Sequence, residues 1–427
     1  MRIEYAAPQY VSDVIAGIGR TEDIKFSPSN RRLAVACFDQ LRILVFDISI
    51  TPATDGPKIS LTNAIEIFAE HLSQPHGIDF VDEETVAVAN RPGSVCIIAL
   101  PAAETGYKSH RLTLLTVLHS EDVELVRAPG SVSVIRKTHN ECDLLVCNNF
   151  IHTVTRHTLR LEPTPAVGDH RLLLNRWLNI PDGICVSPEQ RWIAISNHSS
   201  HNVVIYENTP ALDVTSNPDG ILLGVSCPHG LRFTQDGNYL FVADAGAPYV
   251  HVYGREGPDW RGVHRPLISW RVLDQDTYLR GRINPMEGGP KGIDIDDDMT
   301  VLAMTNQHQA LAFFDVRSIL KSAPLCRCSD RDEAAGSTRL REDDQNELAV
   351  KYELERQDEL NQAVARADQA IERADAAEAR ADQMLMRADQ AELRTAAVMS
   401  STSWQATAPF RLASATLRML RAQFSKK

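Results

Sequence analysis

The sequence contains no apolar run long enough to cross a lipid bilayer, so no part of it predicts a membrane-spanning helix. Residues 1–13 hold no basic stretch followed by an apolar one, and we expect no secretion signal. The net charge of −12 argues against non-specific binding of nucleic acid, because an acidic surface is repelled by phosphates. A cytoplasmic protein without a nucleic-acid partner is therefore expected.

Cysteines are few and follow no metal-binding pattern. Cys326 and Cys328 lack both the two-residue gap and the second ligand pair of a zinc site. Four others fall inside predicted strands, where a free thiol behaves as a small buried hydrophobe: Cys37, Cys96, Cys147 and Cys185. Without an export signal, we expect the thiols to be reduced.

A short phrase recurs along the first three-quarters of the chain: proline, any residue, glycine and then an apolar strand. Looser copies begin at Thr21 and at Pro129. The second positions of the six copies are Glu22, His76, Gly130, Asp182, His229 and Lys291. Repetition at a period near fifty residues indicates stacked supersecondary units, none of which can bury its apolar face alone.

Each unit contains short β-rich runs bounded by Gly, Pro, Asn and Asp, which are typical of antiparallel strands. Three such runs are evident per unit, and each spacer has room for a fourth. Four-stranded sheets repeated around an axis are the blades of a β-propeller. The sequence therefore predicts a mainly β protein, a six-bladed propeller over residues 1–318.

Two rings of side chains are predicted to gather at one mouth of the central channel. If the phrase leads into the innermost strand, its second positions form one ring, in which Glu22 faces Asp182 and His76 faces His229. The ends of the second strands form the other ring. We predict a ligand-binding rim from these positions and Lys291: Asn90, Asn148, Asn197, Asp244, Lys291 and Asn306. Asn and Asp at strand ends are also favoured for turn geometry alone.

Two carboxylates and two imidazoles converging on a channel could hold one divalent metal ion, with Glu22, His76, Asp182 and His229 as ligands. Such an ion could polarise an ester or lactone carbonyl. The alternative is that these charges pair among themselves, as Lys291 could with Glu22, and a lysine here would oppose a cation.

Loop histidines are expected at the same mouth, at His152, His198, His201 and His308. With Phe150 and Trp192 nearby in sequence, this face could bind a carbohydrate by hydrogen bonds and stacking. The same geometry could bind a protein.

The composition changes after the sixth unit. Residues 319–339 are expected to form a linker, and residues 340–399 contain neither Pro nor Gly. Arginines seven residues apart, from Arg366 to Arg387, place alanines on a heptad seam, which predicts a long helical coiled coil and self-association. A solitary charged helix is the alternative.

Residues 400–427 reverse the charge, since residues 396–427 contain five basic residues and no acidic one. Pro409 can open a helix that carries an apolar face flanked by arginines. A basic amphipathic helix of this kind can lie on an anionic membrane, dock on a partner protein, or fold back on the coil. The predicted contact residues are Trp404, Pro409, Phe410, Arg411, Leu417, Arg418 and Arg421.

The repeat pattern over about residues 15–318 resembles the six-bladed gluconolactonase-like (senescence-marker-protein) propellers, and the fifth unit resembles repeats of the YVTN lactonase group. That resemblance implies a metal-dependent lactone or ester hydrolase. Glu22 and Asp182 match the family's metal-binding positions, and Asp182 would serve as the catalytic base. His76 and His229 depart from the family pattern.

The run from Ser401 to Arg411 is similar to the tail found on many bacterial surface-polysaccharide glycosyltransferases and methyltransferases. The resemblance implies a place in O-antigen or capsule assembly, peripheral on the inner face of the plasma membrane.

Three functions stay open. The first is a non-catalytic propeller scaffold of polysaccharide biosynthesis, oligomerised by its coil and bound by its tail to assembly enzymes or membrane. The second is a metal-dependent lactonase, and the third is a carbohydrate-binding propeller. We favour the first because the heptads and the tail are the more specific signals.

Overall fold

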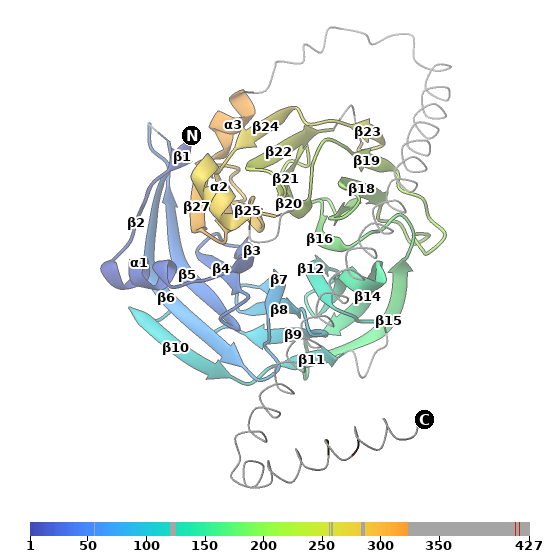
Figure 1. Cartoon of the computed structure of the whole chain (residues 1–427). Helices are drawn as coiled ribbons and strands as arrows, with labels where there is room; N and C mark the ends of the chain where they lie inside the picture. Colours follow the sequence, from blue (N-terminus) through green and yellow to red (C-terminus); the bar gives the residue numbers. More distant parts are fainter. Residues whose placement is uncertain are drawn as a thin grey trace. The chain divides into compact units, whose positions relative to one another are not determined.

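Figure 1 shows the computed structural model of the chain. It describes residues 1–322 except 55, 120–124, 256, 258 and 283–286, and in addition Ala415 and Arg418, both helical. Two compact units are distinguished, residues 1–358 and 359–427. The predicted coiled coil, the tail apart from those two residues, and the linker beyond residue 322 lie outside the described residues.

The described residues of the first unit form six β-sheets arranged around one axis, which confirms the predicted six-bladed propeller (Figure 1). We number the blades in chain order and give strands from the channel outward. Blade 1 contains β3 (Thr21–Phe26), β4 (Arg32–Cys37), β5 (Arg42–Thr51) and β6 (Lys58–Ala69). Blade 2 contains β7 (Pro75–Asp82), β8 (Thr85–Asn90), β9 (Ser94–Ala99) and β11 (Thr116–His119). Blade 3 contains β12 (Pro129–Arg136), β13 (Glu141–Asn148), β14 (Thr153–Arg160) and β15 (Ala166–Leu174).

The other three blades follow the same order. Blade 4 contains β16 (Pro181–Val186), β17 (Trp192–Asn197), β18 (Asn202–Glu207) and β19 (Gly220–Leu222). Blade 5 contains β20 (Pro228–Phe233), β21 (Tyr239–Asp244), β22 (Tyr249–Gly254) and β24 (Ile268–Arg271). Blade 6 contains β25 (Ile293–Ile295), β26 (Val301–Asn306), β27 (Gln309–Asp315) and, from the other end of the domain, β1 (Arg2–Ile3).

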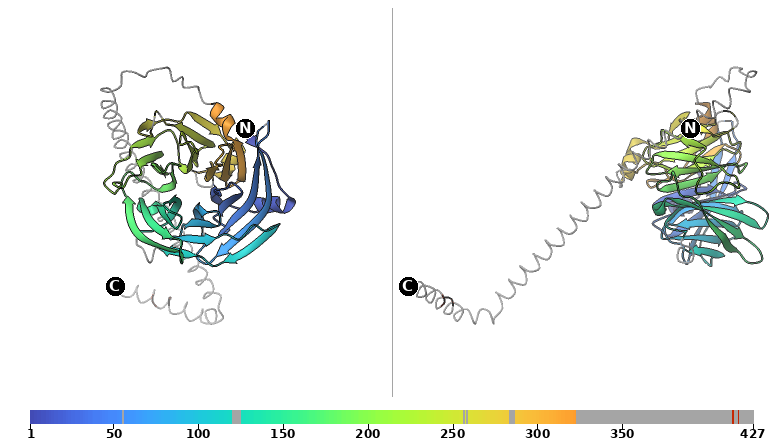
Figure 2. Two further views of the ribbon diagram at one scale, coloured as in Figure 1. Left: turned by 180° about the vertical axis from the view of Figure 1, so that it is seen from behind. Right: turned by 90° about the vertical axis from the view of Figure 1, so that its right-hand side faces the viewer.

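The ring is closed by β1, which pairs antiparallel with β27. Figure 2 shows the N-terminus close to the orange residues at the other end of the domain. Blade 6 therefore takes its fourth strand from the N-terminal residues rather than from the spacer that follows it, which the repeat pattern did not predict. Blade 1 therefore begins at residue 21, and blade 6 contains strands from both ends of the domain.

Two blades are larger than the four strands expected. β10 (Tyr107–Leu112) and β2 (Tyr5–Ala6) pair parallel with β6 of blade 1, and β23 (Gly262–His264) pairs parallel with β19 of blade 4. β10 and β23 belong to the long connections before the outermost strands of blades 2 and 5. Each connection reaches the preceding blade and bonds the exposed backbone groups of its edge.

Apolar residues pack between neighbouring blades rather than within them. Strand β4 illustrates this arrangement, since Leu33 and Val35 enter the core shared with blade 6, whereas Ala34 and Ala36 enter the core shared with blade 2. A middle strand that is covered on both faces must be apolar at nearly every position, which explains the continuous apolar runs of the repeat.

The glycine of the repeated phrase is explained by the close approach of adjacent inner strands. A Cβ atom on Gly77 would lie 2.5 Å from Ser131 Cα, and one on Gly183 would lie 2.1 Å from the carbonyl oxygen of His229. Any side chain at these positions would collide with backbone of the next blade. Blades 1 and 3, whose phrases are looser, carry Asp23 and Ser131 at this position.

Three helices occur among the described residues 1–322: α1 (Gln9–Ala16), α2 (Gln275–Gly281) and α3 (Val316–Lys321), besides the 3-10 turn η1 (Asn149–Ile151). The Asp315 side chain caps α3, and Ile319 is fully buried in the core between blades 5 and 6. Helix α3 therefore packs against the propeller. No helix in the described part of the chain is long and apolar enough to span a bilayer.

Candidate functional site

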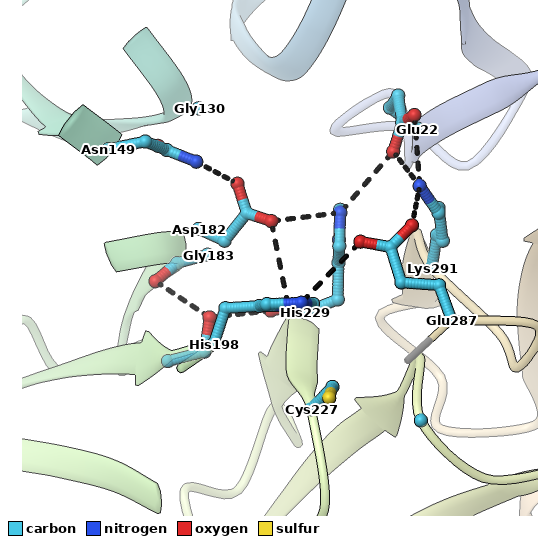
Figure 3. Close-up of polar contacts among 12 residues, drawn as sticks. Glu22, Gly130, Asn149, Asp182, Gly183, His198, Cys227, His229, Glu287 and Lys291 are labelled. Carbon is cyan, nitrogen blue, oxygen red and sulfur yellow. Dashed lines mark hydrogen bonds and ion pairs between the residues drawn. The ribbon is translucent and has the colours of Figure 1, made fainter. Parts of the chain in front are cut away.

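The second positions of the repeated phrase meet at one mouth of the channel, as predicted. We call the cluster of Glu22, His76, Asp182, His229 and Lys291 the channel cluster. Figure 3 labels Glu22, Asp182, His229 and Lys291. These five residues, from five different blades, are at most 7% exposed. They converge because every inner strand begins at the same end of the channel.

Both histidines contact both carboxylates. His229 Nε2 lies 3.3 Å from Glu22 Oε2 and 3.3 Å from Asp182 Oδ2, while His76 Nε2 lies 3.6 Å from Glu22 Oε2 and 3.8 Å from Asp182 Oδ1. The two imidazole rings stack with their centroids 5.3 Å apart. The two pairs predicted to face each other, Glu22 with Asp182 and His76 with His229, therefore form one compact group.

Lys291 pairs with Glu22, the alternative that the sequence had left open. Its Nζ atom donates to both carboxylate oxygens of Glu22, at 3.0 and 2.9 Å. Arg20, which directly precedes β3 in the same blade, also donates to Glu22. A further carboxylate, Glu287, lies 3.1 Å from Lys291 Nζ, so the ammonium bridges two acids.

Asp182 is enclosed in a similar way. Asn149 donates an amide hydrogen to Asp182 Oδ1, and Arg91 Nη2 lies 3.8 Å from the same oxygen. His198 contributes a third neighbour, with its Nδ1 atom 3.9 Å from Asp182 Oδ2. Its Nε2 atom lies 3.4 Å from Glu287, which joins the two sides of the cluster (Figure 3).

Gly130 stands at the second position of the third repeat, and the Asn149 side chain explains why this residue is a glycine. A Cβ atom on Gly130 would lie 2.0 Å from Asn149 Oδ1 and 2.7 Å from Asp182 Oδ1. The asparagine amide therefore fills the space where a sixth side chain of the ring would stand.

The contacts of His76 define its protonation. Its Nδ1 atom lies 2.6 Å from the carbonyl oxygen of Gly130, to which only a protonated nitrogen can donate. Its Nε2 atom lies 3.1 Å from Arg91 Nη2, and an arginine can only donate there. His76 is consequently a neutral imidazole with its proton on Nδ1. Burial and the Arg91 charge agree with this, lowering the pKa of His76 to about 3.

The pKa values of the remaining groups are shifted toward their charged forms. Burial favours the neutral form of Glu22, but the attraction of Lys291 outweighs it and holds the pKa of Glu22 well below its ordinary value. Burial acts likewise on Asp182, yet His229 and Arg91 lower its pKa. Burial disfavours a charged His229, but Asp182 and Glu22 raise the pKa of His229 above its ordinary value. The cluster is thus a network of mutually neutralising ions.

The predicted rim residues other than Lys291 face a different way. Asn90, Asn148 and Asn197 are fully buried, and each accepts a backbone N–H from the loop that leads into its own blade, at 2.9–3.1 Å. Asp244 accepts from Ser226 and Cys227 in the same manner, and Asn306 donates to two glycine carbonyls. These contacts give them an anchoring role, and a role in ligand binding stays a prediction.

Sequence reasoning missed Arg91, Asn149 and Glu287. Arg91 and Asn149, like the predicted loop histidine His198, each come one residue after a predicted rim position, and each reaches the channel cluster. Because side chains of a strand alternate between its faces, a shift of one residue moves a side chain to the other side. This register signal could have identified them, whereas no pattern in the sequence pointed to Glu287.

The predicted loop histidines and aromatics separate on folding. His198 belongs to the site, while His152 Nδ1 accepts the amide hydrogen of Ile180, and Phe150 is 67% exposed beside Arg91. Trp192 was expected near this mouth, which is wrong: it begins β17 at the other end of blade 4 and is completely buried between blades 4 and 5. It cannot stack on a sugar.

Two spaces border the channel cluster. A cavity of about 10 Å³, roughly the volume of one water molecule, is lined by Glu22, His76, Asp182 and His229 and also by Lys25. A pocket of about 260 Å³ has a lining that includes Arg20, Asp39, Glu287, Lys291, Asn306 and Gln307.

Three residues have the arrangement of a possible metal-binding triad, since ligand atoms of Glu22, His76 and His229 all lie within 4.8 Å of one another. The other contacts of these residues do not fit a divalent ion. Both oxygens of Glu22 accept from Lys291, and Arg91 approaches the free nitrogen of His76. An ion on Glu22 would lie within about 5 Å of the Lys291 ammonium, where like charges repel by several kcal/mol even at an effective dielectric constant of about 20.

The fold and this site define the class of the protein as a six-bladed β-propeller with buried charged side chains at one mouth of its channel. Comparison with protein-family models gave no match, and neither did comparison with curated protein sequences.

Among solved structures, the chain is similar to a candidate 6-phosphogluconolactonase from Bacteroides uniformis, with 10% identity, a TM-score of 0.45, and coverage of 68% of this chain and 80% of that one. It is also similar to the hydrazine synthase of Kuenenia stuttgartiensis, with 15% identity, a TM-score of 0.41, and coverage of 69% and 83%. A chain of the mitotic checkpoint complex matches with 9% identity, a TM-score of 0.42, and coverage of 69% and 76%. At these scores the matches carry no argument about function, which has to come from the site.

Proposed function

We propose that the propeller is a non-catalytic interaction module. The observation that supports this function is the state of the channel cluster. Its carboxylates, Glu22 and Asp182, are buried and already bonded to cations or amides of the protein itself. A general base or a metal ligand needs a lone pair that a substrate or an ion can approach, and both oxygens of Glu22 already accept from Lys291. Buried charges that pair with one another are expected of a structural plug.

The rest of the proposal concerns the segment after the propeller. The heptad repeat of residues 340–399 would hold several propellers together, and the tail would bring them to polysaccharide-assembly enzymes at the inner face of the plasma membrane. Several propellers on one stalk would bind a repetitive or membrane-bound partner far more tightly than one alone.

Turnover assays test the absence of catalysis. The full-length protein would be assayed with aliphatic and sugar lactones and aryl esters, with and without added Mn²⁺ or Zn²⁺, alongside Asp182→Asn. We expect both proteins to hydrolyse each compound at the rate of buffer alone. Hydrolysis by the unsubstituted chain that Asp182→Asn abolishes would overturn the proposal.

Vesicle flotation tests the tail. The full-length chain and a version that ends at Met399 would be floated with vesicles of phosphatidylglycerol and phosphatidylethanolamine, and sedimentation would give their oligomeric state. We expect flotation of the full-length chain only, and an oligomer in both cases. Equal flotation of the two would refute membrane docking, and a monomer would refute the coiled coil.

A second candidate function is the metal-dependent lactonase. The proximity of the ligand atoms of Glu22, His76 and His229 favours it. It requires that a metal ion compete with Lys291 for Glu22. Bound metal in the purified chain, together with the turnover described above, would support this function over the first.

A third candidate is carbohydrate binding. The pocket of about 260 Å³ offers the Asp39 carboxylate and the Gln307 amide beside Arg20, groups that suit hydroxyl recognition. Calorimetric titration with mono- and oligosaccharides, with Asp39→Ala as the variant, tests it. Saturable binding that this substitution removes would favour this function.

A further inference from the structure

A second ring of side chains follows the channel cluster along the inner strands. It occupies the positions three residues after the second positions of the repeated phrase: Lys25, Asp79, Ser133, Cys185, Arg232 and Asp294. In the first five blades the register shifts by one residue at the phrase, which keeps these positions on the side of the strand that carries the channel cluster. The channel therefore holds two charged layers.

Most charged members of the second ring have close partners. Arg232 Nε lies 2.8 Å from Asp294 Oδ1, and Asp294 also accepts from the backbone amide of Phe26. Asp79 accepts from the backbone amides of Phe80 and Val134. These contacts leave Lys25 as the group whose partner has to be found.

The Lys25 ammonium is buried without a hydrogen-bond acceptor. Its side chain is 8% exposed, and its Nζ atom lies 3.9 Å from Asp23 Oδ1, beyond hydrogen-bond distance. Within the described part of the chain this ammonium donates no hydrogen bond. Burial favours the neutral amine, but the attraction of Asp23 and Asp294 outweighs it and raises the pKa of Lys25 above its ordinary value. A charged group with three donors therefore needs an acceptor that the described side chains do not supply.

The cavity of about 10 Å³ adjoins this ammonium. Its lining includes Lys25 and Asp23 together with Glu22, Asp182 and His229 of the channel cluster. A space of this size holds one water molecule and nothing larger. The carboxylates in its wall repel an anion and the Lys25 ammonium repels a cation, so the charges favour a neutral ligand. The carboxylates also supply acceptors, since each can accept about four hydrogen bonds.

We propose that this cavity binds one internal water molecule, which accepts a hydrogen bond from Lys25 Nζ and donates to the carboxylates of Asp23 and Asp182. The water supplies the acceptor that the buried ammonium lacks. It also connects the second ring to the channel cluster, so that the two charged layers form one hydrogen-bonded network along the channel. This inference goes beyond the proposed function, because the water is held whether or not the propeller binds a partner.

A high-resolution crystal structure of the full-length chain tests the site. We expect one fully occupied water peak in the cavity, within hydrogen-bond distance of Lys25 Nζ. Crystals soaked in rubidium bromide identify the ligand, because both of these ions scatter anomalously and water does not. An empty cavity, or an anomalous peak inside it, would overturn the proposal.

Lys25→Met tests the anchoring role of the ammonium, because methionine keeps much of the side-chain length and removes the charge. Oxygen-17 relaxation dispersion of the full-length proteins counts the water molecules that stay inside the fold in solution. We expect one fewer in Lys25→Met than in the unsubstituted chain. Lys137→Met is the control, since Lys137 Nζ lies 2.7 Å from Asp143 and its side chain is 41% exposed, and its count should not change.

An equal count in Lys25→Met and the unsubstituted chain would contradict the proposal. The crystallographic outcomes need no variant, so they decide it even if Lys25→Met fails to fold.

Discussion

The carboxylate of Asp294, in the last blade, accepts a hydrogen bond of 2.7 Å from the backbone amide of Phe26, in the first. Two other aspartates make the same connection between successive inner strands. Asp23 accepts from Ile78 at 3.0 Å, and Asp79 accepts from Val134 at 2.8 Å. These side chains join neighbouring blades where no sheet hydrogen bond can, because each sheet ends at its innermost strand.

Replacement of Asp294 should be strongly destabilising. Besides Phe26, the carboxylate holds Arg232, whose Nε atom lies 2.8 Å away, and the aspartate is fully buried. Asp294→Ala leaves a buried amide and a guanidinium without their acceptor, and we expect a loss of about 3–5 kcal/mol in the free energy of unfolding. Urea denaturation followed by tryptophan fluorescence measures it. Asp169→Ala, which removes an exposed pair with Arg160, should cost less than about 1 kcal/mol. Similar losses in both variants would contradict the role of Asp294.

The close approach of the inner strands predicts an effect of adding one methyl group. Gly183→Ala places a Cβ atom 2.1 Å from the carbonyl oxygen of His229, so blades 4 and 5 must separate. We expect a loss of about 3 kcal/mol or more, measured by the same denaturation. Gly168→Ala is the matched control, because only the end of the Arg160 side chain lies near its new methyl group, at 3.9 Å. If Gly183→Ala proves as stable as Gly168→Ala, the inner strands are not in contact as described.

The buried His157 of blade 3 predicts a dependence of stability on pH. Its Nδ1 atom lies 2.8 Å from His170 Nδ1, and its Nε2 atom lies 2.9 Å from Thr155 Oγ1. Burial, aided by the charge of His170, lowers the pKa of His157 to about 3. Between that value and about 6.5 the unfolded chain binds a proton that the folded chain does not, so stability falls as the pH falls.

His157→Gln should reduce that slope. Unfolding free energies measured between pH 4 and 6 should decrease less steeply for the variant, by about 1 kcal/mol per pH unit. Above pH 7, where the histidine is neutral in both states, the variant should show a constant difference from the unsubstituted chain. An unchanged slope between pH 4 and 6 would mean that His157 can be protonated within the folded blade.

Because β1 closes the ring, truncation at the N-terminus should lower the stability of the domain more than truncation after residue 322. Removal of residues 1–6 deletes β1 and β2. It exposes the edge of β27, where Phe313 and Phe314 otherwise pair with Ile3 and Arg2. We expect a Tm lower by several degrees, since even about 1 kcal/mol shifts the Tm of a large domain by about 2 °C. Removal of residues 323–427 leaves all described propeller contacts intact, and calorimetry should show the same Tm for that domain. An equal effect of both truncations would argue against closure by β1.

Much of the fold could be predicted from the repeat. The phrases at Pro75, Pro181 and Pro228 begin inner strands, and the second positions meet at one mouth, because a regular period around an axis brings equivalent positions together. The additional strands β10 and β23 could not be predicted, since they lie in spacers that differ from unit to unit. The strand β1 was missed for a related reason, as its partner lies more than 300 residues away in the chain.

The main residues of the site were predicted from the sequence, but the contacts between them were predicted less well. Glu22, His76, Asp182 and His229 come together as expected, while Arg91 and Asn149, each one residue after a predicted rim position, were missed. Trp192 was predicted near the mouth of the channel but lies at the other end of blade 4, because proximity in sequence was taken for proximity in space. The heptads and the tail motif, including Trp404 and Arg411, remain predictions outside the described residues.

By itself, the sequence determined the number of blades and which positions line the channel, since both follow from a period that apolar packing between blades requires. Only the tertiary structure decided which charge meets which. Lys291 reaches Glu22, and Asn149 occupies the space above Gly130, because side chains from different blades approach within hydrogen-bond distance there. Such partnerships depend on side-chain length and direction at a crowded axis, which a repeat period does not encode.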